Sequence, residues 1–210
     1  DYAASRWPIE YIRSFGIGYA SNSWDTFSLW AKAKGLDKDL LLELGLVKKK
    51  SMSDDVYDTF RGRIMIPVRD KQHRIIAFTA RLLPDILAHD PNAPKYINSS
   101  TSLIYDKGNS LFGIDVAWNV ASKAGVMNLV EGAPDVMRLQ VIGASNTVAP
   151  LGSSWTEAQL SMLKRITDRL NIIPDSDIPK EGEHFGVGFT SAMRTGKLAL
   201  SLGFIVTIQE

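Results

Sequence analysis

Residues 126–142 read VMNLVEGAPDVMRLQVI, and the order of apolar and polar positions in this stretch decides the fold. Its first five residues form a short apolar run that is typical of a buried strand. Pro134 then stands in the first turn of a helix predicted for 134–142, and Gly143 follows the end of that helix, which are the places where these two residues are favoured. A strand that leads directly into a helix is the repeating unit of a parallel α/β sheet.

The same alternation continues toward the end of the chain. Thr156 and Gln159 form a capping-box pattern that opens a helix predicted to run to about residue 169. Gly203 ends a further helix, predicted for 190–202. Regular strand–helix alternation predicts a parallel sheet flanked by helices, with right-handed crossovers. The other strands predicted for this sheet are 146–149, 170–173 and 204–208.

Residues 1–123 are less regular. Two strand-like runs, 63–68 and 74–78, flank a polar turn and predict a β-hairpin. The stretches 48–55 and 84–94 have the composition of exposed loops. Helices are predicted for 24–34, 38–44 and 115–123. We therefore predict an α/β protein, with an α+β N-terminal subdomain over 1–123 and a parallel α/β sheet flanked by helices over 124–210.

The composition bounds the chemistry. A length of 210 residues allows one large domain or two small ones. The chain has no cysteine, which excludes disulfides and thiolate zinc sites in this stretch, and its three widely separated histidines argue against a histidine-rich metal site. No apolar run approaches the ~20 residues that a membrane span needs, and the first residues lack the apolar segment of a secretory signal.

The net charge of +1 is unevenly distributed. Residues 1–123 carry 17 Lys and Arg against 14 Asp and Glu, whereas residues 124–210 carry 7 against 9. A basic half beside an acidic half fits a polyanion groove that faces a metal site. Random variation of the surface explains so small a difference equally well.

Acidic side chains follow two of the predicted strands. The strand at 126–130 runs directly into Glu131, with Asp135 one helical turn later, and the strand at 170–173 is followed by Asp175 and Asp177. Ligands of open parallel sheets bind at the carboxyl ends of strands, so these carboxylates converge if the two strands are neighbours. Mg²⁺ prefers oxygen ligands and supports transfer at phosphorus. The sequence thus predicts a metal site, whereas the alternative is that these acids are helix-dipole partners or solvated turn residues.

Two of these segments carry a family resemblance. Residues 128–136, NLVEGAPDV, resemble the first signature of Toprim domains, in which a strand is followed by Glu-Gly and by an Asp four residues after the Glu. Asp175-Ser176-Asp177 resembles the second signature, Asp-x-Asp. Toprim domains also occur in topoisomerases and nucleases, and the upstream part of the chain decides among these. It is similar to the catalytic core of DnaG-type bacterial DNA primases at 15–20, 42–47, 57–70, 94–99, 105–108 and 111–113, and the similarity continues at 148–153.

The resemblance implies a cytoplasmic primase core that makes short RNA primers on single-stranded DNA from ribonucleoside triphosphates. Glu131, Asp175 and Asp177 would be catalytic, and together with Asp135 they would hold Mg²⁺ or Mn²⁺. The family's zinc module would lie before the chain, and its helicase-binding region and a further acidic motif would lie beyond Glu210. The residues that would bind nucleotide phosphates or DNA are Arg61, Arg63, Arg81, Lys95, Tyr96, Asn98 and Lys107.

The chain departs from the common family pattern at several positions. Ala133 stands in place of the usual aromatic, Ser176 replaces the glycine of Asp-Gly-Asp, and 178–182 replaces the usual Ala-Gly. A second glycine expected after Phe78 is absent, and Asn109 stands in place of an arginine. These departures indicate a divergent member, with a phage or mobile element as one interpretation of its origin.

Two other functions stay open on the residues alone. One is a non-catalytic module that binds single-stranded DNA, and the other is a Toprim nuclease. Lys and Arg neutralise phosphates without reading sequence, so the basic residues fit all of these. For Arg61 and Arg63 the structural alternative is a solvated strand face, and for Tyr96 it is a core or rim aromatic rather than a platform for a base.

Overall fold

The computed structural model describes residues 2–179 and 184–209. The chain divides into two compact units, one made of Asp1–Val68 with Ile75–Asp106 and the other of Arg69–Arg74 with Lys107–Glu210. In the described part of the chain, no helix combines the length and the apolar character that crossing a membrane requires.

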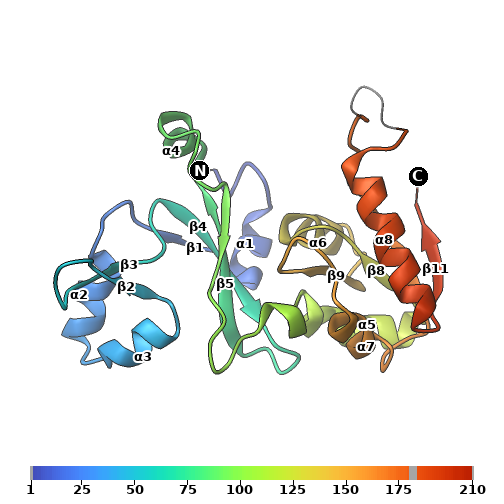
Figure 1. The fold of residues 1–210 in the computed structure, drawn as a ribbon, viewed down its shortest axis with the longest axis horizontal. Coiled ribbons are helices and arrows are strands. Elements are labelled where there is room, and N and C mark those ends of the chain that lie inside the picture. The colour runs from blue at the N-terminus through green and yellow to red at the C-terminus, as the bar shows by residue number, and fades with distance from the viewer. Residues whose placement is uncertain (1, 180–183, 210) are drawn as a thin grey trace. The chain divides into compact units, whose positions relative to one another are not determined.

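The first unit is built on a four-stranded sheet with the strand order β1-β4-β5-β6 (Figure 1). β1 and β6 each pair antiparallel with their neighbours. β4 and β5 are the two arms of the predicted hairpin, and the loop that joins them has His73 in a left-handed conformation at φ 62°. The elements are α1 (Ile9–Phe15), β1 (Gly18–Ala20), β4 (Arg63–Arg69), β5 (Ile75–Leu82), α4 (Pro84–His89) and β6 (Tyr96–Asn98).

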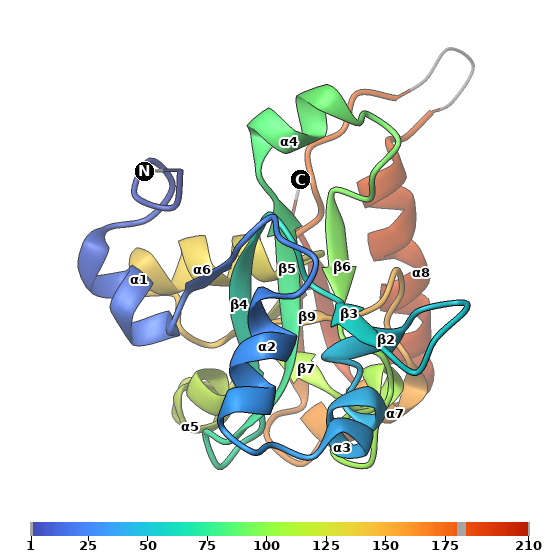
Figure 2. The ribbon, with the colours of Figure 1, turned by 90° about the vertical axis from the view of Figure 1, so that its left-hand side faces the viewer.

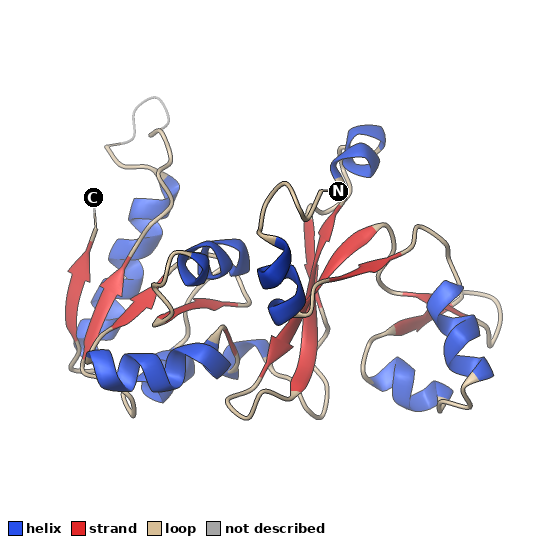
Figure 3. Cartoon of the chain, turned by 180° about the vertical axis from the view of Figure 1, so that it is seen from behind, coloured by secondary structure: helices blue, strands red, loops and turns tan. Residues whose placement is uncertain are grey.

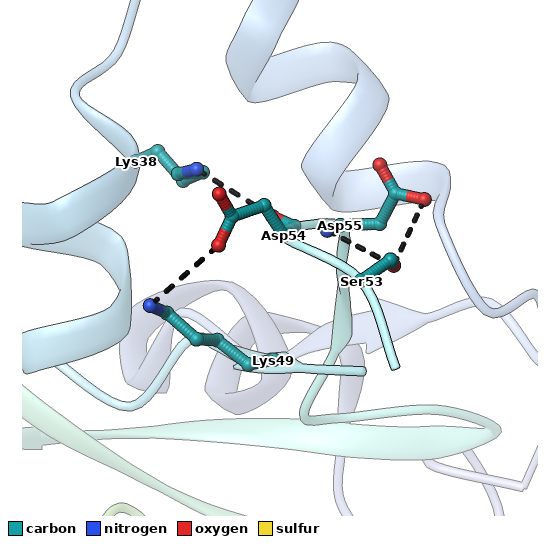
Figure 4. Close-up of polar contacts among 5 residues, drawn as sticks. All are labelled: Lys38, Lys49, Ser53, Asp54 and Asp55. Carbon is teal, nitrogen blue, oxygen red and sulfur yellow. Dashed lines mark hydrogen bonds and ion pairs between the residues drawn. The ribbon is translucent and has the colours of Figure 1, made fainter. Parts of the chain in front are cut away.

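The same unit contains a small group of two helices and a hairpin, which Figure 2 shows as α2, α3, β2 and β3. Its core is formed by the buried Ala31, Leu41 and Val47. The loop of the hairpin is closed by exposed polar contacts, among them Lys49 to Asp54 at 4.0 Å and Ser53 to Asp55 at 3.2 Å (Figure 4). The elements are α2 (Thr26–Ala33), α3 (Lys38–Glu43), β2 (Val47–Lys49) and β3 (Val56–Asp58).

Helix α2 is capped from a distant part of the chain. Asp25 occupies the N-cap position but its side chain makes no capping hydrogen bond. Instead the buried carboxylate of Asp58 accepts the backbone N–H groups of Phe27 at 2.6 Å and Ser28 at 2.8 Å. These donors have no partner within the helix, and a carboxylate at a helix N-terminus satisfies them with a favourable charge. Asp58 therefore fastens α2 to strand β3.

The second unit is the predicted α/β sheet, with the strand order β11-β10-β8-β9-β7. The pairs within β11-β10-β8-β9 are parallel, and β7 adds an antiparallel edge beside β9. Figure 3 shows this sheet with its helices. The elements are β7 (Leu111–Phe112), α5 (Ile114–Ala124), β8 (Met127–Leu129), α6 (Ala133–Val141), β9 (Thr147–Pro150), α7 (Glu157–Leu163), β10 (Arg169–Ile172), α8 (Val187–Ser201) and β11 (Ile205–Ile208).

Alternation along the strands divides the two faces of this sheet. One face contributes Met127, Leu129 and Leu170 to a core that they share with residues of α5, α7 and α8. On the other face, Asn128 accepts a hydrogen bond from Asn171 at 3.1 Å, which joins β8 to β10 by a side-chain bridge. Successive side chains of a strand point to opposite faces of the sheet, so the strand also fixes the face toward which the residues just after its end point.

The sequence-based boundaries differ from the structure at a few places. The second unit contains Arg69–Arg74 and the chain from Lys107 onward, whereas the sequence-based boundary lies at 123/124, because β7 pairs with β9 and α5 packs into the core of the second sheet. The predicted loop at 84–94 contains α4, which starts at a proline, a residue favoured in a first helical turn. The centre of the predicted loop at 48–55 is a loop in the structure, but its first residues belong to β2. Helix α7 ends at Leu163, well before residue 169.

Candidate functional site: carboxylates at the sheet edge

The site begins where β8 and β10 end side by side. These strands are parallel neighbours in the register Ile172 opposite Leu129, and the Ile173 N–H donates to the carbonyl of Leu129 at 2.9 Å. Each strand therefore delivers its following residues to the same edge of the sheet. The Asp175 N–H donates to Oε1 of Glu131 at 3.2 Å, which ties the two strand ends together. The convergence expected from the sequence is present for these two residues.

The carboxylates at this edge repel one another. Partial desolvation raises the pKa of Glu131, and the charges of Asp175, Asp177 and Asp135 raise it further, while the hydrogen bond from the Asp175 N–H lowers it. The pKa of Asp135 is raised by burial and by Asp175, against a smaller opposing effect of Arg138. Like charges held close together disfavour ionisation. The four acids therefore form one electrostatic cluster, at which a cation would be favourable.

Helix α8 starts directly against this cluster. The Gly188 N–H donates to Oδ2 of Asp177 at 3.1 Å. A methyl group built on Gly188 would lie 2.5 Å from the Asp175 carbonyl oxygen and 2.7 Å from Oε1 of Glu131. One built on Gly186, the N-cap of α8, would collide with the backbone of Asp177. The two glycines thus allow the helix to approach both acidic segments.

The cluster offers the right donors for a hard divalent cation, because Mg²⁺ and Mn²⁺ favour carboxylate oxygens. Within residues 2–179 and 184–209, however, no three acidic or histidine side chains already stand in an arrangement that could hold a metal ion. The residues gather at one edge without forming a finished ligand cage. Side-chain rotation at the exposed Glu131, Asp175 and Asp177 would be needed to complete one.

Two arginines implied by the family resemblance are engaged within the first unit. Arg61 lies over the ring of Trp24, with 3.9 Å between the guanidinium carbon and the ring centroid, and it donates to the backbone carbonyl of Asp58. Arg63 is only 6% exposed and its Nη1 donates to the Ala80 carbonyl at 3.5 Å. Burial lowers the pKa of Arg63, and the nearby Arg61 lowers it further. Both contacts are structural, and neither side chain lies on a freely solvated strand face.

The residues of β5 and β6 form a second group. Arg81 lies opposite Tyr96 in the strand register, and its Nη1 donates to the Tyr96 hydroxyl at 2.5 Å. Asn98 is half-buried opposite Thr79, and Lys95 is exposed just before β6. The structure thus brings Arg81, Tyr96 and Asn98 onto one pair of strands, with Tyr96 held by an arginine.

Lys107 belongs to the second unit, in a short 3₁₀ helix, η1 (Lys107–Asn109). The first turn of α7 holds this segment. The buried Gln159 donates from Nε2 to the carbonyls of Lys107 at 2.9 Å and Ser110 at 2.8 Å, and Thr156 donates to the Gly108 carbonyl at 2.6 Å. The capping box recognised in the sequence therefore fixes a candidate binding lysine as well as the start of a helix.

Solved structures of bacterial primase cores share this fold. The Aquifex aeolicus primase, with its zinc-binding and RNA polymerase domains, matches with a TM-score of 0.85 and 31% identity over 99% of this chain and 48% of that chain. The E. coli primase catalytic core matches with a TM-score of 0.81 and 30% identity over 99% of this chain and 63% of that one. These similarities define the class of the protein as a primase-type catalytic core.

Sequence comparisons give the family itself. Residues 1–118 match the family model for the N-terminal domain of the DNA primase catalytic core. The DNA primase of Clostridium acetobutylicum is 36% identical over 167 residues, which are 79% of this chain and 26% of that protein. That of Deinococcus radiodurans is 35% identical over 157 residues, 75% of this chain and again 26% of the relative. The chain belongs to the DNA primase catalytic-core family, and it spans about a quarter of the length of these curated relatives.

The sequence alone did not single out Gly186 and Gly188 as residues of the site. They follow a segment that departs from the family pattern, and the helix was predicted to begin only at Thr190, whereas α8 begins at Val187. A pair of glycines two residues apart before an apolar helical pattern is the signal that could have marked them. Their role depends on contacts with residues on other strands, which the local pattern does not contain.

Proposed function

We propose that this chain carries the polymerising site of a DNA primase, which joins ribonucleotides into short RNA primers on a single-stranded DNA template. The observation that carries the proposal is the gathering of Glu131, Asp135, Asp175 and Asp177 at the carboxyl ends of two neighbouring parallel strands. Family membership supports the reaction class, which is metal-dependent nucleotidyl transfer.

Within this proposal, Glu131, Asp175 and Asp177 are the catalytic acids, and with Asp135 they hold Mg²⁺. When bound, the ion neutralises charge that develops on phosphate oxygens and favours in-line attack by a 3′-hydroxyl. The protein orients its own ligands through the backbone, because the Asp175 and Gly188 N–H groups each hold one carboxylate oxygen. Mn²⁺ is expected to substitute, since it shares the preference for oxygen ligands.

Template and nucleotide binding are proposed for the basic and polar residues of the family resemblance. A related DnaG catalytic domain, with a TM-score of 0.80 and 30% identity, has been solved bound to single-stranded DNA. We assign direct contacts to Lys95, Asn98 and Lys107, which lie on exposed or half-buried positions. Arg61, Arg63 and Arg81 act indirectly, through the contacts with Trp24, Ala80 and Tyr96 that they stabilise. Tyr96 presents its ring beside Arg81. Contact with a replicative helicase is proposed for regions outside this 210-residue chain.

A gel assay with labelled single-stranded DNA, ribonucleoside triphosphates and Mg²⁺ or Mn²⁺ tests the proposal. We expect RNA products from the wild-type chain and none from Glu131→Gln, because the amide keeps the acceptor for the Asp175 N–H and removes only the charge. Glu157→Gln, an exposed change on α7, is the matched control and should synthesise normally. Wild-type synthesis by Glu131→Gln would refute the assignment of the acids.

The same gel separates the other two functions. Salt-sensitive binding of the template without product under either metal would identify a non-catalytic DNA-binding module. Metal-dependent nicking of DNA in the absence of nucleotides would identify a nuclease. Either result would replace the proposed polymerising activity while leaving the family assignment intact.

A further inference from the structure

A groove of about 530 Å³ lies along the start of α8, in the second unit. It is lined by His184 and Phe185 before the helix, by Ser191 and Arg194 within it, and by Ser153 from the loop that follows β9. A cation, an imidazole and hydroxyl groups on one wall are a set of donors suited to an anion. Arg offers a fork of N–H groups that matches phosphate oxygens.

The cationic side chain in the lining of the groove is Arg194. This side chain is exposed, and within the described residues it takes part in no ion pair with an acidic residue. Thr190 also lines the groove, but its hydroxyl donates to the Gly186 carbonyl at 3.0 Å and so cannot donate to a ligand at the same time. The donors available to a phosphate are therefore those of Arg194, with Ser191 and Ser153 beside it.

The lining of the groove also includes an aromatic surface. Phe185 stacks on Phe189 with 4.8 Å between ring centroids and an interplanar angle of 28°, yet Phe185 is still 58% exposed. A stacked pair with one ring before the helix and the other in its first turn can fix the entry of the chain, much as a hydrophobic staple does. The open face of Phe185 is nevertheless a platform on which a planar base can stack.

Helix α8 links the groove to the carboxylate cluster. Gly188, which contacts both Asp177 and Glu131, lies in the first turn of the helix that carries Ser191 and Arg194. Six residues of α-helix separate Gly188 from Arg194, which is about 9 Å along the axis. One nucleotide with its phosphates is long enough to span this separation. The groove is thus placed to hold part of a ligand whose reacting phosphate sits at the acids.

We propose that this groove is a subsite for one nucleotide unit, with the base stacked on Phe185 and a phosphate held by Arg194 and Ser191. Its placement in the reaction rests on the proposed polymerising function, whereas binding itself does not. A free nucleoside triphosphate and a nucleotide within a strand share this chemistry. Most of the residues that line the groove lie at the start of α8 and just before it.

Equilibrium binding to the 210-residue chain in metal-free buffer tests the subsite with two probes, ATP and a fluorescein-labelled dT 12-mer. Arg194→Gln removes the cation, and Phe185→Leu keeps an apolar contact with Phe189 while removing the ring face. Lys197→Gln, at an exposed position of the same helix, is the charge control. We expect the two groove variants to weaken binding of at least one probe by five-fold or more and the control by less than two-fold.

The pattern of losses identifies the source of the nucleotide. Weaker binding of ATP alone assigns the groove to a free nucleotide, and weaker binding of the 12-mer alone assigns it to a strand. Binding of both probes that is unchanged in both groove variants, or matched by Lys197→Gln, overturns the subsite. If the wild-type chain makes no primers but the groove variants lose binding, the polymerising function alone is refuted. If the wild-type chain makes primers but the groove variants bind as it does, the subsite alone is refuted.

Discussion

Replacing Gly188 by alanine perturbs the contact that brings α8 to the carboxylates. The new methyl carbon would lie 2.5 Å from the Asp175 carbonyl oxygen and 2.7 Å from Oε1 of Glu131. The first of these neighbours is backbone and cannot rotate away, so either the segment that carries Asp175 or the first turn of α8 must move. The hydrogen bond from the Gly188 N–H to Asp177 lies within the same turn and would be disturbed with it.

The magnitude follows from two opposing effects. Alanine favours the helix over glycine by at most about 1 kcal/mol, while forcing an extra carbon into a filled site costs about 1–3 kcal/mol. We expect Gly188→Ala to lower the free energy of unfolding by up to about 2 kcal/mol, the difference of these effects. Displacement of catalytic groups by about 1 Å can cost a factor of ~100 in rate, so primer synthesis should fall far more than stability does.

Gly196→Ala is the matched control in the same helix. A methyl group there would meet Cδ1 of Ile208 at 3.3 Å and Cγ1 of Val206 at 3.7 Å, which are ends of side chains and can yield. We expect unchanged primer synthesis and a stability equal to the wild type or higher by up to about 1 kcal/mol. Thermal melting followed by circular dichroism and the primer gel measure both properties. A Gly188→Ala chain that melts and synthesises like the wild type would refute the close approach of α8.

Three further changes test buried side chains that hold the fold together. Asp58→Ala should lower the free energy of unfolding by about 2–3 kcal/mol in urea titrations, because two charge-assisted hydrogen bonds are lost, and Asp58→Asn should cost less; equal losses would argue against a role for the charge. Gln159→Ala should destabilise by about 2 kcal/mol and weaken DNA binding through Lys107, and normal binding measured by fluorescence anisotropy would separate the two residues. Burial and, to a smaller extent, Asp106 raise the pKa of Tyr105 to about 12, so the buried neutral phenol stabilises the fold below pH ~10 and this contribution is lost as the pH rises toward 12. Tyr105→Phe should therefore flatten the fall of melting temperature above pH ~10, and an unchanged alkaline profile would contradict the assignment.

The parallel sheet and its acidic edge could be predicted because their determinants are local. Alternating strands and helices imply the parallel sheet, and the rule that ligands bind at strand ends then points to Glu131 and Asp175. The register of β8 against β10 confirms that the two strands are parallel neighbours, while the binding role of these residues stays a prediction. The short apolar run at 126–130 was sufficient for this purpose, although the strand itself is confined to Met127–Leu129.

Contacts between residues far apart in the sequence could not be predicted in the same way. The family resemblance predicts that Arg61 binds phosphates, which stays a prediction. No residue near Arg61 in the sequence indicates that Trp24 lies beneath its guanidinium group. Asp58 likewise caps a helix that begins more than thirty residues earlier, while the local candidate Asp25 makes no cap. In both cases the partner is chosen by the tertiary fold, which overrides the local preference.

The electrostatics of the sheet edge connect stability to the proposed function. Burial raises the pKa values of Glu131 and Asp135 most, and the neighbouring carboxylates raise them further, so the fold maintains an unfavourable crowding of charge in a partly desolvated place. Backbone N–H groups of Asp175 and Gly188 hold Glu131 and Asp177 in place, and each of these hydrogen bonds uses one carboxylate oxygen. A divalent cation would turn the mutual repulsion into attraction to a shared centre. The crowding that disfavours the free chain is therefore the property that would let the same residues hold a metal ion against nucleotide phosphates.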